Sequence, residues 1–342
     1  MNVVTRLGCL EMLLGGTTTF TDMYYFEDVV AEAAKEAGMR GVLGETIIGF
    51  PVPDAKTPAE SLAWTEKYIQ RYRNDPLVTP AVAPHALYTN SAETLRAARA
   101  LANKYAVPLV IHVSETRKET EDCVKEHGAR PVPYLASLGV FDGRTVAAHC
   151  VWLDEADMAI VRDRSVGVAH CPSSNMKLAS GIAPIARMLA LGIHVGLGPD
   201  GPAGSNNDFD LMEEMNLAAD LQKVSTSDPR SIPAEQALAM ATIDGARVIG
   251  RERDLGSLEA GKLADMVMIR LDRPHAVPLY NVYSQLVYAL KGSDVRDVMV
   301  NGRIIVSDSR SLTLDPGVII EKAREYRSSV QQSLHTPQVV SH

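Results

Sequence analysis

The sequence predicts an α/β fold, namely a TIM-like (β/α)8 barrel without its first strand, followed by a small, partial β-sandwich domain. Short apolar segments alternate with helical patterns in units of roughly 30 residues, which is typical of βαβ units. The apolar segments are nearly continuous, as expected of parallel strands that are covered on both faces. Seven of them precede residue 231, whereas a closed barrel of this type has eight.

The expected elements follow from this alternation. Asn90 is expected to cap the helix that follows it, with Glu93 reaching back, and Gly38 and Gly192 stand where helices should end. The strands are expected at residues 17–23, 40–48, 78–83, 108–113, 144–149, 166–170 and 194–197. The helices between them are expected at residues 27–37, 58–72, 91–105, 118–127, 154–164 and 182–191.

The pattern changes after Ser231. Residues 233–250 indicate one long helix, because proline suits its first turn and Gly250 suits its end. Short strands follow, among them 263–269, and the Asn301-Gly302 pair favours a type I′ hairpin turn within residues 298–306. A helix at 316–334 and a disordered polar tail should complete the chain. We therefore divide the chain into a barrel, residues 1–250, that is incomplete at its N-terminus, and a C-terminal β-domain segment, residues 251–342.

The composition describes a soluble globular protein. The 342 residues are 46% hydrophobic and 22% charged, and no apolar run approaches the roughly 20 residues of a membrane span. The net charge of −8 argues against nucleic acid or an anionic membrane as a partner. The four cysteines include no Cys-x-x-Cys pair, which is typical of reduced thiols, so we expect a cytoplasmic protein.

Four polar side chains stand at or just after the carboxyl ends of expected strands. His112 ends an apolar strand and Glu115 follows it, while His149 and Asp200 close two later segments. Parallel barrels carry their chemistry at this end of the strands. Histidine and aspartate are ligands of catalytic metal ions, which lower the pKa of a bound water from about 15.7 to about 7. A carboxylate such as Glu115 can then carry a proton.

Each of these residues also has an ordinary structural explanation. A single histidine at a strand end is more often structural than functional, and an aspartate before Gly201 suits a turn. His170 also ends a strand, where packing behind a site explains it at least as well as a direct role. Cys150 and Cys171 follow histidines, but their spacing is better explained by buried small side chains than by a structural zinc site.

Several ordered motifs carry a family resemblance. From Leu7 to about Tyr326 the chain resembles the amidohydrolase superfamily, specifically the methylthioadenosine/S-adenosylhomocysteine deaminase group and its chlorohydrolase relatives. The motifs lie at residues 15–22, 83–85, 111–116, 147–150, 170–178, 197–201, 205–207 and 256–265.

The resemblance implies roles for the residues at the strand ends. It makes His112 and Asp200 ligands of one divalent metal ion, expected to be zinc, with iron or manganese as alternatives. It makes Glu115 the proton shuttle and a substrate contact, and it has His149 orient the attacking hydroxide or polarise the carbon under attack. Asp200 would also accept a proton from the water.

The same resemblance implies contacts with the substrate. His85 would face it, and Ser205 would line the site, although Ser205 could equally shape its own loop. Members of the group that hold the homocysteine carboxylate use arginines near the segment 44–56. That segment has Glu45 and no arginine, and Lys56 offers only a point charge, so S-adenosylhomocysteine is not the expected substrate.

The chain departs from the family pattern at its beginning. The family's first barrel strand ends in His-x-His and supplies two metal ligands, whereas the first histidine here is His85. We therefore expect Met1 to be an internal start, and the chain by itself to show little turnover. The expected ancestral activity is hydrolytic deamination of an amino-purine or similar heterocycle.

Several alternatives stay open at this point. The same residues would serve halide displacement from a triazine-like ring or hydrolysis of a cyclic amide. The chain could instead be a non-catalytic remnant, or use Glu115 and Asp200 as paired carboxylates without a metal. The expected partners are a small heterocyclic substrate and water, with homo-oligomer formation left open.

Overall fold

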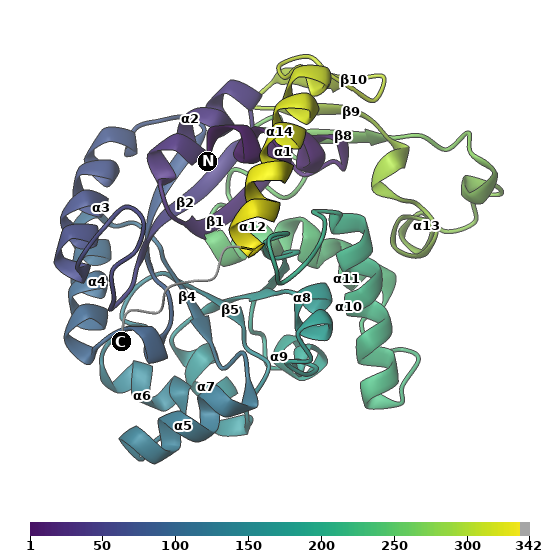
Figure 1. Ribbon diagram of the computed structural model, residues 1–342. Coiled ribbons are helices and arrows are strands. Elements are labelled where there is room, and N and C mark those ends of the chain that lie inside the picture. The colour runs from purple at the N-terminus through teal and green to yellow at the C-terminus, as the bar shows by residue number, and fades with distance from the viewer. Residues whose placement is uncertain (336–342) are drawn as a thin grey trace.

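The computed structural model describes residues 1–335, which form a curled parallel sheet, its covering helices and a smaller antiparallel sheet (Figure 1). The parallel sheet runs in the order β1-β2-β3-β4-β5-β6-β7, so each strand pairs with its neighbour in sequence. The expected seven strands are therefore confirmed, each to within two residues at either end. They are β1 (Thr19–Tyr24), β2 (Arg40–Ile47), β3 (Val78–Pro84), β4 (Leu109–Val113), β5 (Thr145–His149), β6 (Gly167–His170) and β7 (Val195–Leu197).

Helices connect successive strands and pack on the outer face of the curl (Figure 1). No helix among residues 1–335 is long and apolar enough to cross a membrane. The helices up to β7 are α1 (Asn2–Leu14), α2 (Glu27–Ala37), α3 (Pro58–Tyr72), α4 (Ala92–Tyr105), α5 (Arg117–His127), α6 (Pro131–Ser137), α7 (Glu155–Asp163), α8 (Pro172–Lys177) and α9 (Ile185–Ala190). Those after it are α10 (Leu211–Thr226), α11 (Ala234–Ala241), α12 (Ile243–Ile249), α13 (Val282–Tyr288) and α14 (Pro316–His335).

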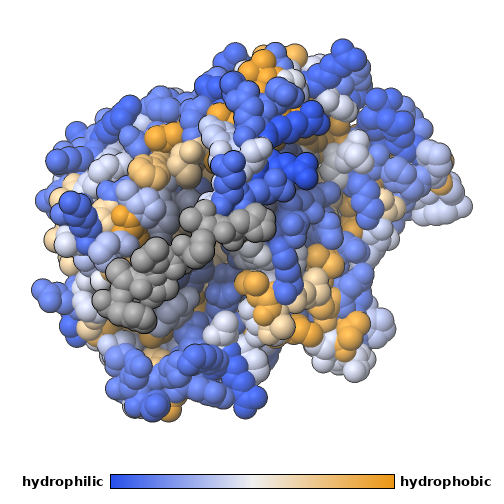
Figure 2. Space-filling model, viewed as in Figure 1, coloured by the Kyte–Doolittle hydropathy of each residue, from blue (hydrophilic) through white to orange (hydrophobic). Residues whose placement is uncertain are grey.

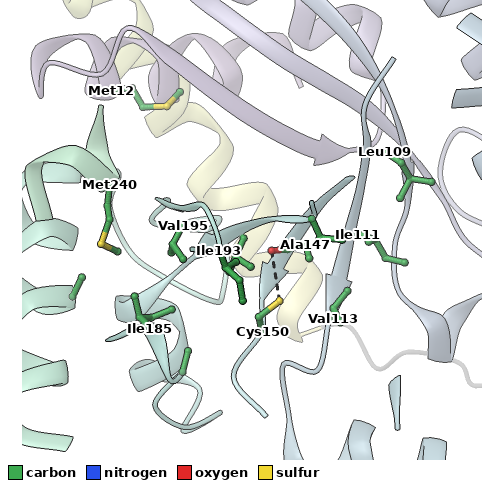
Figure 3. Packing of buried hydrophobic residues seen from close by; sticks show 14 of the residues in the cluster. Met12, Leu109, Ile111, Val113, Ala147, Cys150, Ile185, Ile193, Val195 and Met240 are labelled. Carbon is green, nitrogen blue, oxygen red and sulfur yellow. Dashed lines mark hydrogen bonds between the residues drawn. The ribbon is translucent and has the colours of Figure 1, made fainter. Parts of the chain in front are cut away.

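The two faces of the parallel sheet have separate hydrophobic cores. Leu109, Ile111 and Val113 of β4 belong to the large core under the helices, together with residues of neighbouring elements (Figure 3). Val110 points to the opposite face, into a smaller core inside the curl. Because side chains alternate along a strand, His112 shares the inner face with Val110 at the carboxyl end of the strand.

Helix α12 fills the inside of the curl at the opposite end from His112. A side chain at Gly196 of β7 would place its Cβ 2.9 Å from the Gly245 Cα, and one at Gly167 of β6 would lie 2.9 Å from the Val248 Cα. Glycine at these two positions therefore allows α12 to approach the strands closely.

Two expectations about the helices are wrong. The single helix expected at 233–250 is divided at Thr242, whose φ and ψ are −129° and −98°. The Thr242 hydroxyl donates to the Leu238 carbonyl, a local bond that competes with helix continuation. Ser91, not Asn90, caps α4 by accepting from the Thr94 amide at 3.1 Å. Helices α1, α6, α8, α10 and α13 were not expected.

Asn90 does not cap α4 but forms hydrogen bonds with two backbone carbonyls. Its side-chain amide donates to the Ile47 and Ala86 carbonyls, both at 3.1 Å. It therefore ties the end of β2 to the loop that follows β3. Gly38 adopts the left-handed conformation after α2, as expected, with φ of 76°.

The second sheet follows α12 in the chain. Strands β8 (Met266–Ile269), β9 (Val295–Val300), β10 (Arg303–Ser307) and β11 (Arg310–Ser311) form an antiparallel sheet in the order β11-β10-β9-β8. Asn301 and Gly302 have φ of 51° and 77°, which confirms the hairpin turn. The expected polar tail lies outside the described residues, and the domain division at residue 250 stays a prediction.

A buried ion pair connects the two sheets. The Arg40 guanidinium at the start of β2 donates to both carboxylate oxygens of Asp265 at 3.2 Å, and the side chains are only 1% and 6% exposed. Arg40 also donates to the Pro76 carbonyl at 2.7 Å, and Asp265 accepts from the Asn301 amide at 2.6 Å. The pair therefore fixes the hairpin of the small sheet against the parallel sheet.

Replacing Arg40 with methionine should destabilise the protein by about 3–5 kcal/mol, because it leaves the Asp265 carboxylate buried without its partner. Urea unfolding followed by circular dichroism measures this change. Lys118→Ala is the matched control, since the Lys118–Asp122 pair is exposed and its loss should cost less than about 0.5 kcal/mol. Equal destabilisation by the two variants would show that the buried pair has no special role.

Candidate active site

Three histidines meet at the carboxyl ends of β3, β4 and β5. The His85 and His112 ring centroids are 4.8 Å apart, and those of His112 and His149 are 5.3 Å apart. The spacing follows from the sheet, in which Val113 is the register partner of His149 and Ala86 bridges to His112. Regular alternation would turn His149 outward with Val113, and the left-handed φ of 71° at His149 is the point where that alternation ends.

The proton of His112 is fixed by its backbone neighbour. The His112 Nδ1 lies 2.8 Å from the His85 carbonyl, which can only accept, so Nδ1 carries the proton. The Nε2 atom therefore keeps its lone pair, as a metal ligand requires. Burial, followed by the nearby His149, lowers the pKa of His112 and favours this neutral form.

His85 is also held neutral and in one orientation. Its Nδ1 lies 3.0 Å from the Thr89 hydroxyl, whose own proton goes to the Ala86 carbonyl at 3.2 Å. Thr89 therefore accepts from Nδ1, and the His85 Nε2 is left as an acceptor. Burial, with smaller contributions from His112 and His149, lowers the pKa of His85 to about 4.

His149 lies between two carboxylates. Its side chain is 2% exposed, and its Nε2 is 3.9 Å from both Glu115 Oε2 and Asp200 Oδ2. The Nδ1 atom is 3.0 Å from the Asn175 side-chain carbonyl oxygen. These residues come from the ends of β4, β5 and β7 and from α8, so the tertiary fold brings them together.

The loops that carry these side chains are held by further hydrogen bonds. The buried Glu119 carboxylate accepts the Ser114 amide at 2.9 Å and the Glu115 amide at 2.8 Å. Asp200 Oδ2 accepts from the Ser174 hydroxyl at 2.7 Å, and Oδ1 accepts from the Gly201 amide at 2.6 Å. The Glu115 backbone and the Asp200 carboxylate are therefore held in place by neighbouring groups.

The backbone is strained at the same strand ends. Ser114, His149, Cys150 and Asp200 have φ of 51°, 71°, 50° and 64°, in the left-handed region that side chains other than glycine rarely occupy. Such strain costs of the order of 1–3 kcal/mol per residue and gathers at functional sites. Four strained residues after three strands support the view that this edge of the sheet is functional.

The structure brings together most, but not all, of the site residues that the sequence predicted. His85, His112, Glu115, His149 and Asp200 lie together. The hydroxyl of Ser205 donates to the Gly201 carbonyl at 3.2 Å, a contact within its own loop, so its role toward a substrate stays a prediction.

Sequence reasoning missed several residues of the site. It gave no role to Glu119, although a second glutamate four residues after Glu115 was a visible signal. It gave none to Ser174 or Asn175 either, which act across strands and leave no spacing pattern. His170 is 1% exposed beside His149, and burial lowers its pKa to about 3.

The candidate donor atoms are of the types that bind metal ions, but there are too few of them for a complete site. The His112 Nε2 and the Asp200 carboxylate are the types of donor that zinc takes. Within residues 1–335, however, no group of three histidine, cysteine, aspartate or glutamate side chains is arranged to hold a metal ion. The described residues therefore supply part of a metal site.

A second group of carboxyl side chains lies under β1 and β2. Glu27 and Glu45 are 0% and 3% exposed, and the Glu45 carboxylate accepts from the Glu27 amide at 3.1 Å. Burial, followed by a hydrogen bond with Asp54, raises the pKa of Glu45 to about 9. Burial also raises the pKa of Glu27 well above its usual range. The Glu45 carboxyl group is therefore enclosed by its neighbours Glu27 and Asp54.

Known proteins match nearly the whole of this chain. A model of the amidohydrolase family matches residues 2–305. The 5-methylthioadenosine/S-adenosylhomocysteine deaminase of Thermodesulfovibrio yellowstonii is 45% identical over 329 residues, which cover 96% of this chain and 75% of that protein.

Solved structures give the same picture. An adenosine deaminase from Xanthomonas campestris with bound zinc has a TM-score of 0.95 and 36% identity, covering 97% of this chain and 75% of that one. An atrazine chlorohydrolase from Arthrobacter aurescens TC1, complexed with zinc, has a TM-score of 0.88 and 27% identity, covering 95% and 76% of the two chains.

The buried carboxyl groups predict how stability depends on pH. Because the pKa of Glu45 is raised in the folded state, that state keeps a proton that the unfolded chain releases, so stability should fall from about pH 5 to about pH 9. Glu45→Gln, which is neutral throughout, should flatten this fall. Thermal unfolding across the range measures it, with the exposed Glu121→Gln as control. Parallel pH profiles of Glu45→Gln and the wild type would contradict the assignment.

Proposed function

The chain belongs to the amidohydrolase family, and we propose that it catalyses the hydrolytic deamination of an amino-purine nucleoside. The observation that carries the proposal is the position of the His149 Nε2, 3.9 Å from the carboxylates of both Glu115 and Asp200. A base, an acid and an orienting imidazole within one small space suit the addition of water to a ring carbon and the departure of ammonia. The names of the relatives, a 5-methylthioadenosine/S-adenosylhomocysteine deaminase and an adenosine deaminase, agree with this reaction.

The fold supports a site of this kind. We infer that the seven parallel strands are part of an eight-stranded barrel, in which one further strand would lie between β1 and β7. These two strands are the edges of the sheet, and an edge strand leaves backbone groups free for pairing. The high structural similarity to a deaminase agrees with this inference.

We assign His112 and Asp200 as two ligands of a divalent metal ion, which we take to be zinc. The fixed Nδ1 proton of His112 and the two hydrogen bonds to the Asp200 carboxylate orient both groups, as is usual behind metal ligands. When bound, the metal would lower the pKa of a water molecule and polarise the atom under attack. Iron and manganese are the alternatives that the donor types also allow.

The side chains of the chain itself then have separate tasks. Glu115 takes a proton from the attacking water and delivers it to the departing amine, so that water and the amino-heterocycle become the oxo-heterocycle and ammonia. Its Oε1 is 3.5 Å from the Ser180 hydroxyl, which steadies the carboxylate. His149 orients the attacking oxygen through its Nε2. Asp200 accepts the second proton of the same water and passes it to the ring nitrogen next to the carbon under attack, so both carboxylates are restored.

His85 and Ser205 are assigned to substrate binding. Because the His85 Nε2 is left as an acceptor, it would bind an N–H or O–H group of the substrate. Hydrophobic residues cover the region of α8 and α9 in Figure 2, and Met176, Leu178 and Ile182 of this region are exposed. Such a surface beside the site suits an apolar heterocycle.

Halide displacement is less well supported than deamination. The deaminases are 45% and 36% identical to this chain, whereas the chlorohydrolase is 27% identical. The same side chains could serve either reaction, so the choice rests on similarity.

Glu115→Gln should lower the rate of ammonia release from adenosine or 5′-deoxyadenosine by about 10²–10⁴-fold, because the amide cannot carry the proton. Ammonia is measured with zinc present, and circular dichroism checks the fold. Glu121→Gln, an exposed glutamate of α5, is the control and should keep full activity. Undiminished release by Glu115→Gln would contradict the proposed role. No release by the wild-type chain would contradict the proposed function for this chain and would bear out the little turnover that the sequence led us to expect of the chain by itself.

His112→Ala and Asp200→Ala should each weaken zinc binding by at least about 10-fold, because each removes a ligand. Isothermal titration measures the affinity without any turnover. His127→Ala is the control, since His127 stacks on Tyr134 at a 4.0 Å centroid distance away from the site. If both ligand variants bind zinc as tightly as the wild type, the assignment is wrong.

A further inference from the structure

We propose that Asn175 is a positioning residue, which fixes the proton of His149 on Nδ1 and so directs Nε2 toward Glu115 and Asp200. The inference rests on the proposed function, because it concerns the same site. Asn175 lies within the motif at residues 170–178, to which the sequence assigned no role, and its role follows from contacts that the tertiary structure creates.

The contact between Asn175 and His149 is short and buried. The Asn175 carbonyl oxygen lies 3.0 Å from the His149 Nδ1, and the residues are 1% and 2% exposed. A carbonyl oxygen can only accept, so Nδ1 must donate. The other ring nitrogen, Nε2, is then the one that faces both carboxylates at 3.9 Å.

The backbone places Asn175 firmly. Its amide donates to the Cys171 carbonyl at 3.0 Å, and its own carbonyl accepts from the Ser180 amide at 2.8 Å. The preceding residue, Ser174, is fully buried and donates to Asp200 Oδ2 at 2.7 Å. Two adjacent residues of α8 therefore hold the two groups that flank the reacting position.

The topology explains why α8 can do this. Helix α8 follows β6, and β6 lies between β5 and β7 in the sheet. His149 ends β5 and Asp200 follows β7, so a helix that starts above β6 has one of them on each side. Successive residues of a helix point about 100° apart, which lets Ser174 and Asn175 reach different neighbours.

A buried carboxyl group anchors the start of α8. Glu214 of α10 is 1% exposed, and its carboxyl accepts from the Ser173 amide at 3.3 Å and from the Ser173 hydroxyl. A hydrogen bond to a buried carboxyl is costly to lose. Helix α8 is therefore a fixed support, and Asn175 cannot follow His149 if that ring turns.

The test reads the proton position directly. The full chain labelled with ¹⁵N-histidine gives a ring pattern for each tautomer in two-bond ¹H–¹⁵N spectra, and His149→Gln assigns the His149 signals. We expect a protonated Nδ1 in the wild type. A wild-type His149 whose Nδ1 carries no proton would overturn the proposal without the need for any variant.

Two substitutions then test the cause. Asn175→Asp keeps an acceptor oxygen and should keep the Nδ1 proton, whereas Asn175→Leu removes the acceptor at similar size and should shift His149 toward the Nε2-protonated form. Asn216→Leu, a control on α10 whose amide bonds only to Asp220, should change nothing at His149. An unchanged His149 pattern in a folded Asn175→Leu protein would overturn the proposal, and so would the loss of the Nδ1 proton in Asn175→Asp.

Turnover gives an independent reading. Asn175→Leu should lower kcat by about 10²-fold with little change in KM, because a misplaced group affects the reaction more than binding. Since the tautomer is observed without substrate, a chain that releases no ammonia contradicts the proposed function and leaves the tautomer result to decide the role of Asn175. A larger change in KM than in kcat would mean that Asn175 contacts the substrate and is not a positioning residue.

Discussion

The parallel register of β4, β5, β6 and β7 is the constraint on which the site depends. Strands that pair in order and end at one level bring His112, His149 and His170 to neighbouring positions, at the spacing of roughly 4.8 Å between strands. The His112 and His149 ring centroids are 5.3 Å apart although His149 pairs with Val113, because the left-handed φ of 71° at His149 ends the regular alternation of that strand. A shift of one residue in β4 would turn His112 to the outer face and remove it from the site.

Buried carboxyl groups hold the loops that leave this edge. Glu119 binds the backbone amides of Ser114 and Glu115, and Glu214 binds the amide of Ser173. Backbone amides in a buried loop need partners, and a carboxylate can accept several. Burial raises the pKa of Glu119, and it raises the pKa of Glu214 to about 7. Burying these two carboxyl groups therefore costs free energy, which the packed core must offset. The site is stiff because its loops are bonded to the helices behind them.

Sequence reasoning predicted the parts of the structure that local patterns determine. Apolar runs and helical spacing gave the seven strands and six of the helices between them, but not the short helices α6 and α8. Polar residues at strand ends gave His112, Glu115, His149 and Asp200, and the family resemblance added His85. Sequence reasoning was wrong where contacts between distant parts of the chain decide whether a helix continues or which side chains meet. The break at Thr242 occurs where α11 packs on α10 and α13 while α12 packs on β6 and β7. Asn175 could not be found because its partner lies 26 residues away.

The two edge strands of the sheet bring carboxyl groups of like charge within electrostatic reach of each other. The sheet curls, and the charge of Asp200 after β7 helps to raise the pKa of Asp22 on β1 to about 6, behind the larger effect of burial. The ends of the two edge strands therefore lie close enough to interact. Like charges at such a place disfavour ionisation of both groups, and a bound cation would reverse the sign of that effect. The half of the site from β4 to β7 is supported by its own hydrogen bonds, so its side chains are held in place by the protein itself.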